Sequence, residues 1–144
     1  MKQARRIAIL ATAALLALSA TALAGKPKSG TYHGALAAPR TTYLVSMRLA
    51  GVKLTHVTLS NVPIYCSGGG PAIPVTFPAA KISAAGRFTV KATVRIKVGP
   101  KKGQIGEKLT LSGRFAHGKV SGTLKTVFVS FAQCSGSSRF TAAR

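Results

Sequence analysis

The chain has 144 residues, the length of one domain, and its hydrophobic content of 47% is ordinary for a globular protein. Its charge is extreme, because Lys and Arg total 21, Asp and Glu total 1, and the formal net charge is +20. Glu107 is the single acidic residue. The composition therefore excludes chemistry that requires two protein carboxylates, such as acid–base glycoside cleavage, and carboxylate-ligated Ca²⁺ or Mg²⁺ sites.

Residues 1–24 have the pattern of a secretory signal peptide. An uncharged apolar stretch from Ile7 to Leu18 follows a basic start that contains Lys2, Arg5 and Arg6. The small side chains of Ala22 and Ala24 precede Gly25 at the spacing that signal peptidase accepts. We therefore expect cleavage after Ala24 and a secreted or extracytoplasmic protein with no transmembrane span in its mature part. Cleavage would remove three of the 21 basic residues and leave a net charge of +17. The alternative is an uncleaved anchor, but the apolar segment is at the short end of the lengths that span a bilayer.

Residues 25–30 predict a short flexible lead-in, and residues 31–144 predict a single domain of strands. Apolar and polar residues alternate at period two, which is typical of strands with one face in a core and one in water. The early inward series are Val45, Met47 and Leu49, and then Ile73, Val75 and Phe77. The longest inward series is Phe88, Val90, Ala92, Val94, Ile96 and Val98.

The alternation continues to the C-terminus, with Glu107 interrupting the series Ile105, Leu109 and Leu111. The later apolar positions are Phe115, Val120, Gly122, Leu124, Phe140 and Ala142. Apolar residues also interleave between Val127 and Phe131, so we expect this stretch to be buried on both faces.

Turn signals separate these segments at intervals of about ten residues. They include Gly51, Asn61-Val62-Pro63, Gly68-Gly69-Gly70-Pro71, Gly99-Pro100 and His117-Gly118. Short strands at this spacing predict an all-β fold, a single antiparallel β-sandwich or small β-barrel of about eight strands.

Several short motifs lie along the mature part of the chain. They are Gly30–Gly34 (GTYHG), Cys66 before a Gly-rich loop, the GRF strand starts at Gly86 and Gly113, Gly122–Leu124 (GTL) and Cys134–Ala142 (CSGSSRFTA). In this order they resemble the small secreted all-β proteins of unknown function found in actinobacteria. The resemblance implies a secreted β domain and carries over no catalytic residues.

The two cysteines, Cys66 and Cys134, predict a disulfide, because an even number of cysteines in an exported domain is typical of bridged pairs. Two buried thiols or one reactive cysteine are the alternatives. His33, His56 and His117 have no metal-ligand spacing with one another or with the cysteines, so we predict no metal site and no cofactor. No acidic residue is free to orient a Ser–His pair, and we predict that the protein is not an enzyme.

The basic residues show the clearest pattern that bears on function. The polar positions between Arg87 and Lys97 are mostly cationic, and a turn at residues 99–103 would bring the next strand alongside. We therefore predict a basic β-ribbon that consists of Arg87, Lys91, Arg95, Lys97, Lys101, Lys102, Lys108 and Arg114. Such a surface attracts polyanions through counterion release without reading a sequence.

The expected partners are wall polymers such as teichoic acids, acidic polysaccharide, anionic lipid surfaces or extracellular nucleic acid, with no sequence-specific nucleic-acid recognition. The alternative is a structural envelope protein with no specific ligand, in which the charge only maintains solubility.

Overall fold

The structure is a computed structural model that describes residues 26–38, 41–63, 72–97, 99–129 and 134–144. The predicted signal peptide, Cys66, Val98 and Phe131 lie outside the described residues.

The described chain folds into one antiparallel sheet of nine strands. The strands are β1 (Gly30–Ala38), β2 (Thr41–Ala50), β3 (Lys53–Pro63), β4 (Ala72–Thr76), β5 (Ala80–Lys81), β6 (Arg87–Arg95), β7 (Ile105–Ala116), β8 (Lys119–Phe128) and β9 (Gly136–Ala143). The predicted all-β fold class is confirmed.

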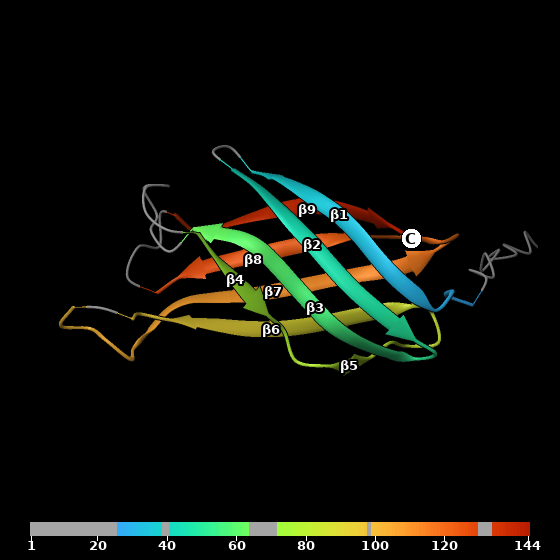
Figure 1. Cartoon of the computed structure of the whole chain (residues 1–144), viewed down its shortest axis with the longest axis horizontal. Coiled ribbons are helices and arrows are strands. Elements are labelled where there is room, and N and C mark those ends of the chain that lie inside the picture. The colour runs from blue at the N-terminus through green and yellow to red at the C-terminus, as the bar shows by residue number, and fades with distance from the viewer. Residues whose placement is uncertain (1–25, 39–40, 64–71, 98, 130–133) are drawn as a thin grey trace, which may run out of the picture.

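The sheet wraps around a single core and is nearly closed. Its order is β4-β3-β2-β1-β9-β8-β7-β6, so the first and last long strands of the chain pair with each other. Figure 1 shows strands β1 to β4 forming one layer, and β6 to β9 crossing behind them as the second. The fold is therefore a flattened barrel in which each layer is a meander of sequential strands.

The segment between β4 and β6 covers the gap where these two edge strands do not pair. Strand β5 pairs with β3, and the Ser83 amide donates a hydrogen bond to the Arg87 carbonyl oxygen at 2.8 Å. The Gly86 carbonyl oxygen accepts from the Phe115 amide at 3.0 Å. The segment is thus hydrogen-bonded to β3 of one layer and to the β6–β7 pair of the other.

The core consists of the inward residues of both layers. Its largest fully buried side chains include Tyr32, Leu36, Met47, Leu54, Leu59, Leu109, Leu111, Phe115 and Leu124. Tyr32 and Phe115 contact edge to face, with ring centroids 5.0 Å apart. The inward series predicted on β2, β4 and the start of β6 are confirmed as core positions.

Two inward glycines of neighbouring strands, Gly113 of β7 and Gly122 of β8, lie where there is no space for a side chain. A Cβ atom on Gly122 would overlap the backbone oxygen of Ser112, and the rings of Phe140 and Phe88 cover Gly122 and Gly113 respectively. Glycine at these positions lets neighbouring strands and an aromatic ring approach closely, which is how strongly bent sheets are commonly built.

Two expectations about burial were wrong. The described part of the stretch that begins at Val127 is not buried on both faces, because Val127 and Phe128 are half-buried and Val129 is 53% exposed. The inward series of β6 also does not continue unchanged to its end. A register shift between Val94 and Arg95 places an extra residue in β7, and Ile96 is only half-buried.

The described part of the lead-in, residues 26–29, lies against the barrel. The Tyr32 hydroxyl donates to the Lys28 carbonyl oxygen at 2.6 Å, and the Arg144 guanidinium donates to the Ser29 carbonyl oxygen at 3.2 Å. These contacts connect the two ends of the described chain.

Candidate anion-binding surface

The predicted β6–β7 hairpin is present, and the cationic side chains of its two strands lie on the outer face. Arg87 pairs directly with Arg114, Lys91 with Thr110, and Thr93 with Lys108. The side chains of Arg87, Lys91, Lys108 and Arg114 are all exposed. The alternation of β6 therefore produces the arrangement expected from it, with apolar residues inward and cations outward.

The other residues of the predicted ribbon lie toward the far end of the hairpin. Arg95 ends β6 and donates a hydrogen bond to the Gly103 carbonyl oxygen at 2.7 Å. Lys97, Lys101 and Lys102 lie in the connection between β6 and β7, which extends beyond the sheet in Figure 1. These three lysines thus belong to a protruding tip and not to the sheet face.

Strands β8 and β9 add cations that the sequence interpretation did not include. Lys119, Lys125 and Arg139 are exposed on the same outer face. We name the outer side of β6 to β9 the cationic face. Its charged residues are Arg87, Lys91, Arg95, Lys108, Arg114, Lys119, Lys125 and Arg139.

Hydroxyl groups occupy most of the positions between these cations. They come from Thr89, Thr93, Thr110, Ser112, Ser121, Thr123, Ser137 and Thr141. The Thr89 and Ser112 hydroxyls lie 3.2 Å apart, within hydrogen-bond distance. The face therefore presents cations and neutral hydroxyls, both of which can donate hydrogen bonds to an anion.

An open hollow of about 470 Å³ lies on this face where β1 meets β9. Its lining includes Arg139 together with the hydroxyl-bearing residues Ser121, Thr123 and Thr141, and Ala35 of β1 forms one side. A guanidinium surrounded by hydroxyls has the donor set that binds a carboxylate, phosphate or sulfate group.

Glu107, the only acidic side chain of the protein, lies inside the barrel. It is 3% exposed, and its Oε2 atom has no hydrogen-bond partner in the described structure. Desolvation raises the pKa of Glu107 to about 7, and burial and then the charge of Glu107 raise the pKa of Tyr43. The burial of Glu107 leaves the described surface without an acidic side chain that could neutralise its cations.

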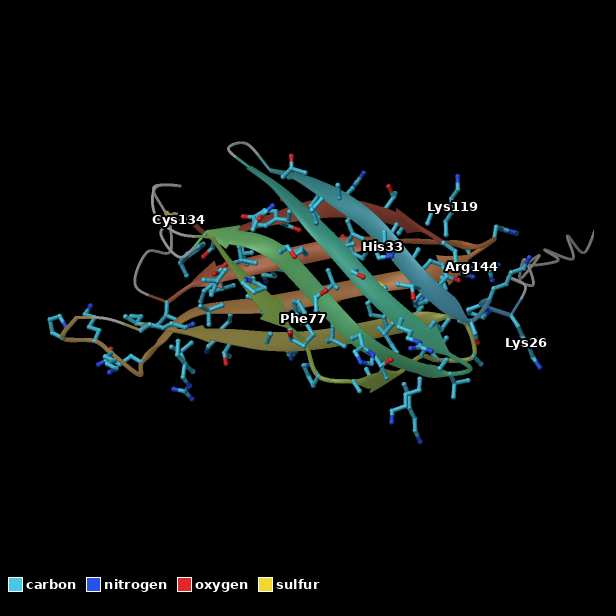
Figure 2. The ribbon with its side chains drawn as sticks, in the orientation of Figure 1. Lys26, His33, Phe77, Lys119, Cys134 and Arg144 are labelled. Carbon is cyan, nitrogen blue, oxygen red and sulfur yellow. The ribbon has the colours of Figure 1, made fainter. Side chains whose placement is uncertain are left out.

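Further cations gather at one end of the barrel. Figure 2 shows Lys119, Arg144 and Lys26 at the same end of the molecule, and Cys134 at the opposite end. The cationic character is therefore not confined to the hairpin from which the sequence interpretation started.

Cys134 lies two residues before β9 and is not a free thiol. Its predicted partner, Cys66, lies outside the described residues, so the disulfide between them stays a prediction. His33 and His56 lie in β1 and β3, and His117 lies in the β7–β8 turn, as expected.

Within the described ranges, no group of three or more His, Cys, Asp or Glu residues is placed to hold a metal ion. The described residues also include no helix with the length and apolar character needed to cross a membrane.

Comparisons with known proteins gave no match to a family model, to a curated protein or to a solved structure. The functional interpretation therefore depends on the geometry and charge of the described residues.

Proposed function

We propose that the protein is an exported, non-enzymatic β domain that binds anionic polymers of the cell envelope or its surroundings through the cationic face. The observation that supports this proposal is the separation of charge. Eight cations lie on the outer side of β6 to β9, while the only acidic side chain is buried in the core. A folded protein with this distribution has a strong positive field that its own side chains do not neutralise.

A polymer is favoured over a small anion because the cations are spread over four strands. Polyanions that contact several cations release several counterions, so their affinity increases with every contact. The face is also open, and a long ligand can lie across it without entering a cleft. Export rests on the pattern of residues 1–24 and on the resemblance to secreted all-β proteins.

One observation favours the alternative, a structural envelope protein with no specific ligand. Strand β6 lies at an edge of the sheet and carries Lys91 and Arg95. Charged side chains on an edge strand prevent pairing with a strand of another molecule. In this alternative the cations protect the edge and maintain solubility, and no ligand is needed.

The experiment that separates these functions is retention of the purified protein on heparin at low salt, followed by titration with heparin at several NaCl concentrations. Polyanion binding predicts retention, and a logarithm of affinity that falls linearly with the logarithm of salt concentration. Elution in the low-salt wash would contradict the proposed function and leave the structural alternative.

A further inference from the structure

We infer that the cationic face binds a hydroxyl-rich anionic polysaccharide along one diagonal of the sheet, with an anionic group in the hollow beside Arg139. This inference rests on the proposed function and specifies its ligand and its path. It depends on the register of β6 to β9, the hollow, and the hydroxyls between the cations.

The strand register aligns four cations along one diagonal. Arg139 of β9 pairs with Thr123 of β8, and Lys125 lies two residues further along β8. Lys125 pairs with Thr110, and Lys108 lies two residues away from Thr110 on β7.

The same step reaches β6, because Lys108 pairs with Thr93 and Arg95 follows two residues later. We name this set the diagonal track. It contains Arg139, Lys125, Lys108 and Arg95, one cation from each of four neighbouring strands.

The spacing of the diagonal track is regular from Arg139 to Lys108. Neighbouring strands lie about 4.8 Å apart and alternate residues of a strand about 6.7 Å apart, so a regular step of the diagonal is about 8 Å. The steps from Arg139 to Lys125 and from Lys125 to Lys108 follow this geometry. The last step, from Lys108 to Arg95, crosses the register shift between Val94 and Arg95. A regular line of single charges matches an extended polymer that carries its anionic groups at regular intervals.

The hollow lies at the β9 end of the diagonal track and gives it a fixed starting point. Arg139 lines the hollow together with the hydroxyl-bearing residues Ser121, Thr123 and Thr141. Its guanidinium can hold a carboxylate with two parallel hydrogen bonds. The neighbouring hydroxyls both donate and accept, which suits a ligand that itself carries hydroxyls.

Hydroxyls also line the rest of the diagonal track. Thr123, Thr110 and Thr93 are the cross-strand partners of successive track cations and lie along one side of it. A sugar polymer presents hydroxyl groups between its charges, so cations and hydroxyls of the face would meet groups of matching chemistry.

The described aromatic residues disfavour single-stranded nucleic acid as the ligand. Tyr32, Phe77, Phe88, Phe115 and Phe140 are buried and Tyr43 and Phe128 are half-buried, so none of them is an exposed stacking platform. Proteins that bind single strands gain much of their affinity by stacking bases on exposed aromatic rings. An acidic polysaccharide needs no such ring.

The diagonal track is tested by comparing two double variants with equal loss of charge. Lys108→Gln with Lys125→Gln removes two track cations. Lys53→Gln with Lys81→Gln removes two exposed cations that pair with each other on β3 and β5, away from the cationic face. Circular dichroism and thermal unfolding confirm that each variant is folded before binding is measured.

The binding probe is a purified oligogalacturonate, an acidic polysaccharide with one carboxylate per sugar. We expect the track variant to bind it at least about tenfold more weakly at low salt, because it loses two charge-assisted contacts. Its salt slope should fall by about 2. The control variant should change affinity by about twofold or less, since its charges are largely screened at that distance. Equal losses in the two variants would overturn the diagonal track.

The choice of polysaccharide is tested with a length-matched oligoglutamate, which has carboxylates but no hydroxyls, and with an oligothymidylate. We expect the oligogalacturonate to bind more tightly than both. Thr123→Val removes one hydroxyl of the hollow with little change in the shape of the side chain. It should weaken the binding of the oligogalacturonate alone. Arg139→Gln should weaken the binding of all three polymers.

These outcomes distinguish the inference from the proposed function. If the protein binds none of the three polymers and is not retained on heparin, the proposed function is wrong. If all three polymers bind equally and Thr123→Val changes nothing, polyanion binding survives and the polysaccharide inference is wrong. Tighter binding of the oligothymidylate would instead indicate a nucleic acid as the ligand.

Discussion

The burial of Glu107 predicts that the protein becomes less stable as the pH rises from 4.5 to 7. In the unfolded chain this carboxyl has its ordinary pKa of 4.5, and in the folded protein desolvation raises the pKa to about 7. Well below pH 4.5 the carboxyl is protonated in both states, so it does not make the free energy of unfolding depend on pH. Between the two values the unfolded state releases the proton and the folded state keeps it, so the free energy of unfolding falls with pH. Above pH 7 the full loss remains.

The magnitude follows from the raised pKa. Each pH unit between the folded and unfolded pKa corresponds to about 1.4 kcal/mol. The rise from 4.5 to about 7 therefore lowers the free energy of unfolding by about 3 kcal/mol at pH 8, relative to pH 4. Most proteins lose stability in acid because their paired carboxylates are protonated. This chain has a single acidic side chain, so its dependence on pH should have the opposite sign.

The variant Glu107→Met tests this reasoning, since methionine is unbranched, similar in length and uncharged. Urea unfolding followed by circular dichroism at pH 4 and pH 8 gives the free energy of unfolding of both proteins. We expect the advantage of the variant over the wild type to be about 3 kcal/mol larger at pH 8 than at pH 4. Lys108→Met changes the charge of the adjacent outward residue and should leave the pH profile parallel to the wild type. An equal advantage of Glu107→Met at both pH values would refute the buried, raised-pKa state of Glu107.

Gly122→Ala should lower the free energy of unfolding by about 1–3 kcal/mol because its Cβ would overlap strand backbone, whereas Gly136→Ala, with no atom near its Cβ, should be neutral in the same urea assay. N-terminal sequencing of the exported protein should give Gly25 as the first residue, and an intact N-terminus in the membrane fraction would contradict cleavage. Peptide mapping without reductant should recover Cys66 joined to Cys134, and free alkylation of both thiols in the native protein would exclude the bridge. Raising NaCl from about 0.01 to 0.3 M should raise the melting temperature by screening cation repulsion, and a flat response would indicate that the cations do not interact.

The strand pattern of the sequence predicted much of the second layer. Phe88, Val90 and Val94 alternate with charged or hydroxyl residues, and the structure buries all three. The hairpin that follows was predictable from its turn, and its register places Arg87 beside Arg114. Local alternation is sufficient here because sequential strands joined by a turn pair with each other.

The rest of the cationic face could not be predicted from local patterns. Arg139 joins the face because β9 pairs with both β8 and β1, which is a property of the whole topology. The hollow beside Arg139 depends on that same pairing. The register shift near Arg95 also has no clear sequence signal, although Gly106 lies close to it in β7.

Glu107 did carry a signal, since it continues the spacing of Ile105, Leu109 and Leu111. We nevertheless predicted that Glu107 interrupts the inward series, because an ionised carboxylate in a core is costly. In the structure, burial raises the pKa of Glu107 to about 7, so the carboxyl stays protonated over a wider range of pH. A group that is mostly protonated below neutral pH can occupy an inward position that an ordinary glutamate would avoid.

The charge distribution connects the stability of the fold to its proposed ligand. Arg87 and Arg114 lie directly opposite each other, and like charges in that position destabilise a sheet by a few tenths of a kcal/mol per pair. A sheet evolved only for stability would place a carboxylate beside such a pair, but here the neighbouring outward residue on β8 is Ser121. The one carboxylate that the chain possesses is enclosed in the core, where it cannot reach the face. Any external anion that binds only the folded state would both satisfy the cations and increase stability by linkage. The repulsion that weakens the free protein is therefore the same feature that would make it a receptor for polyanions.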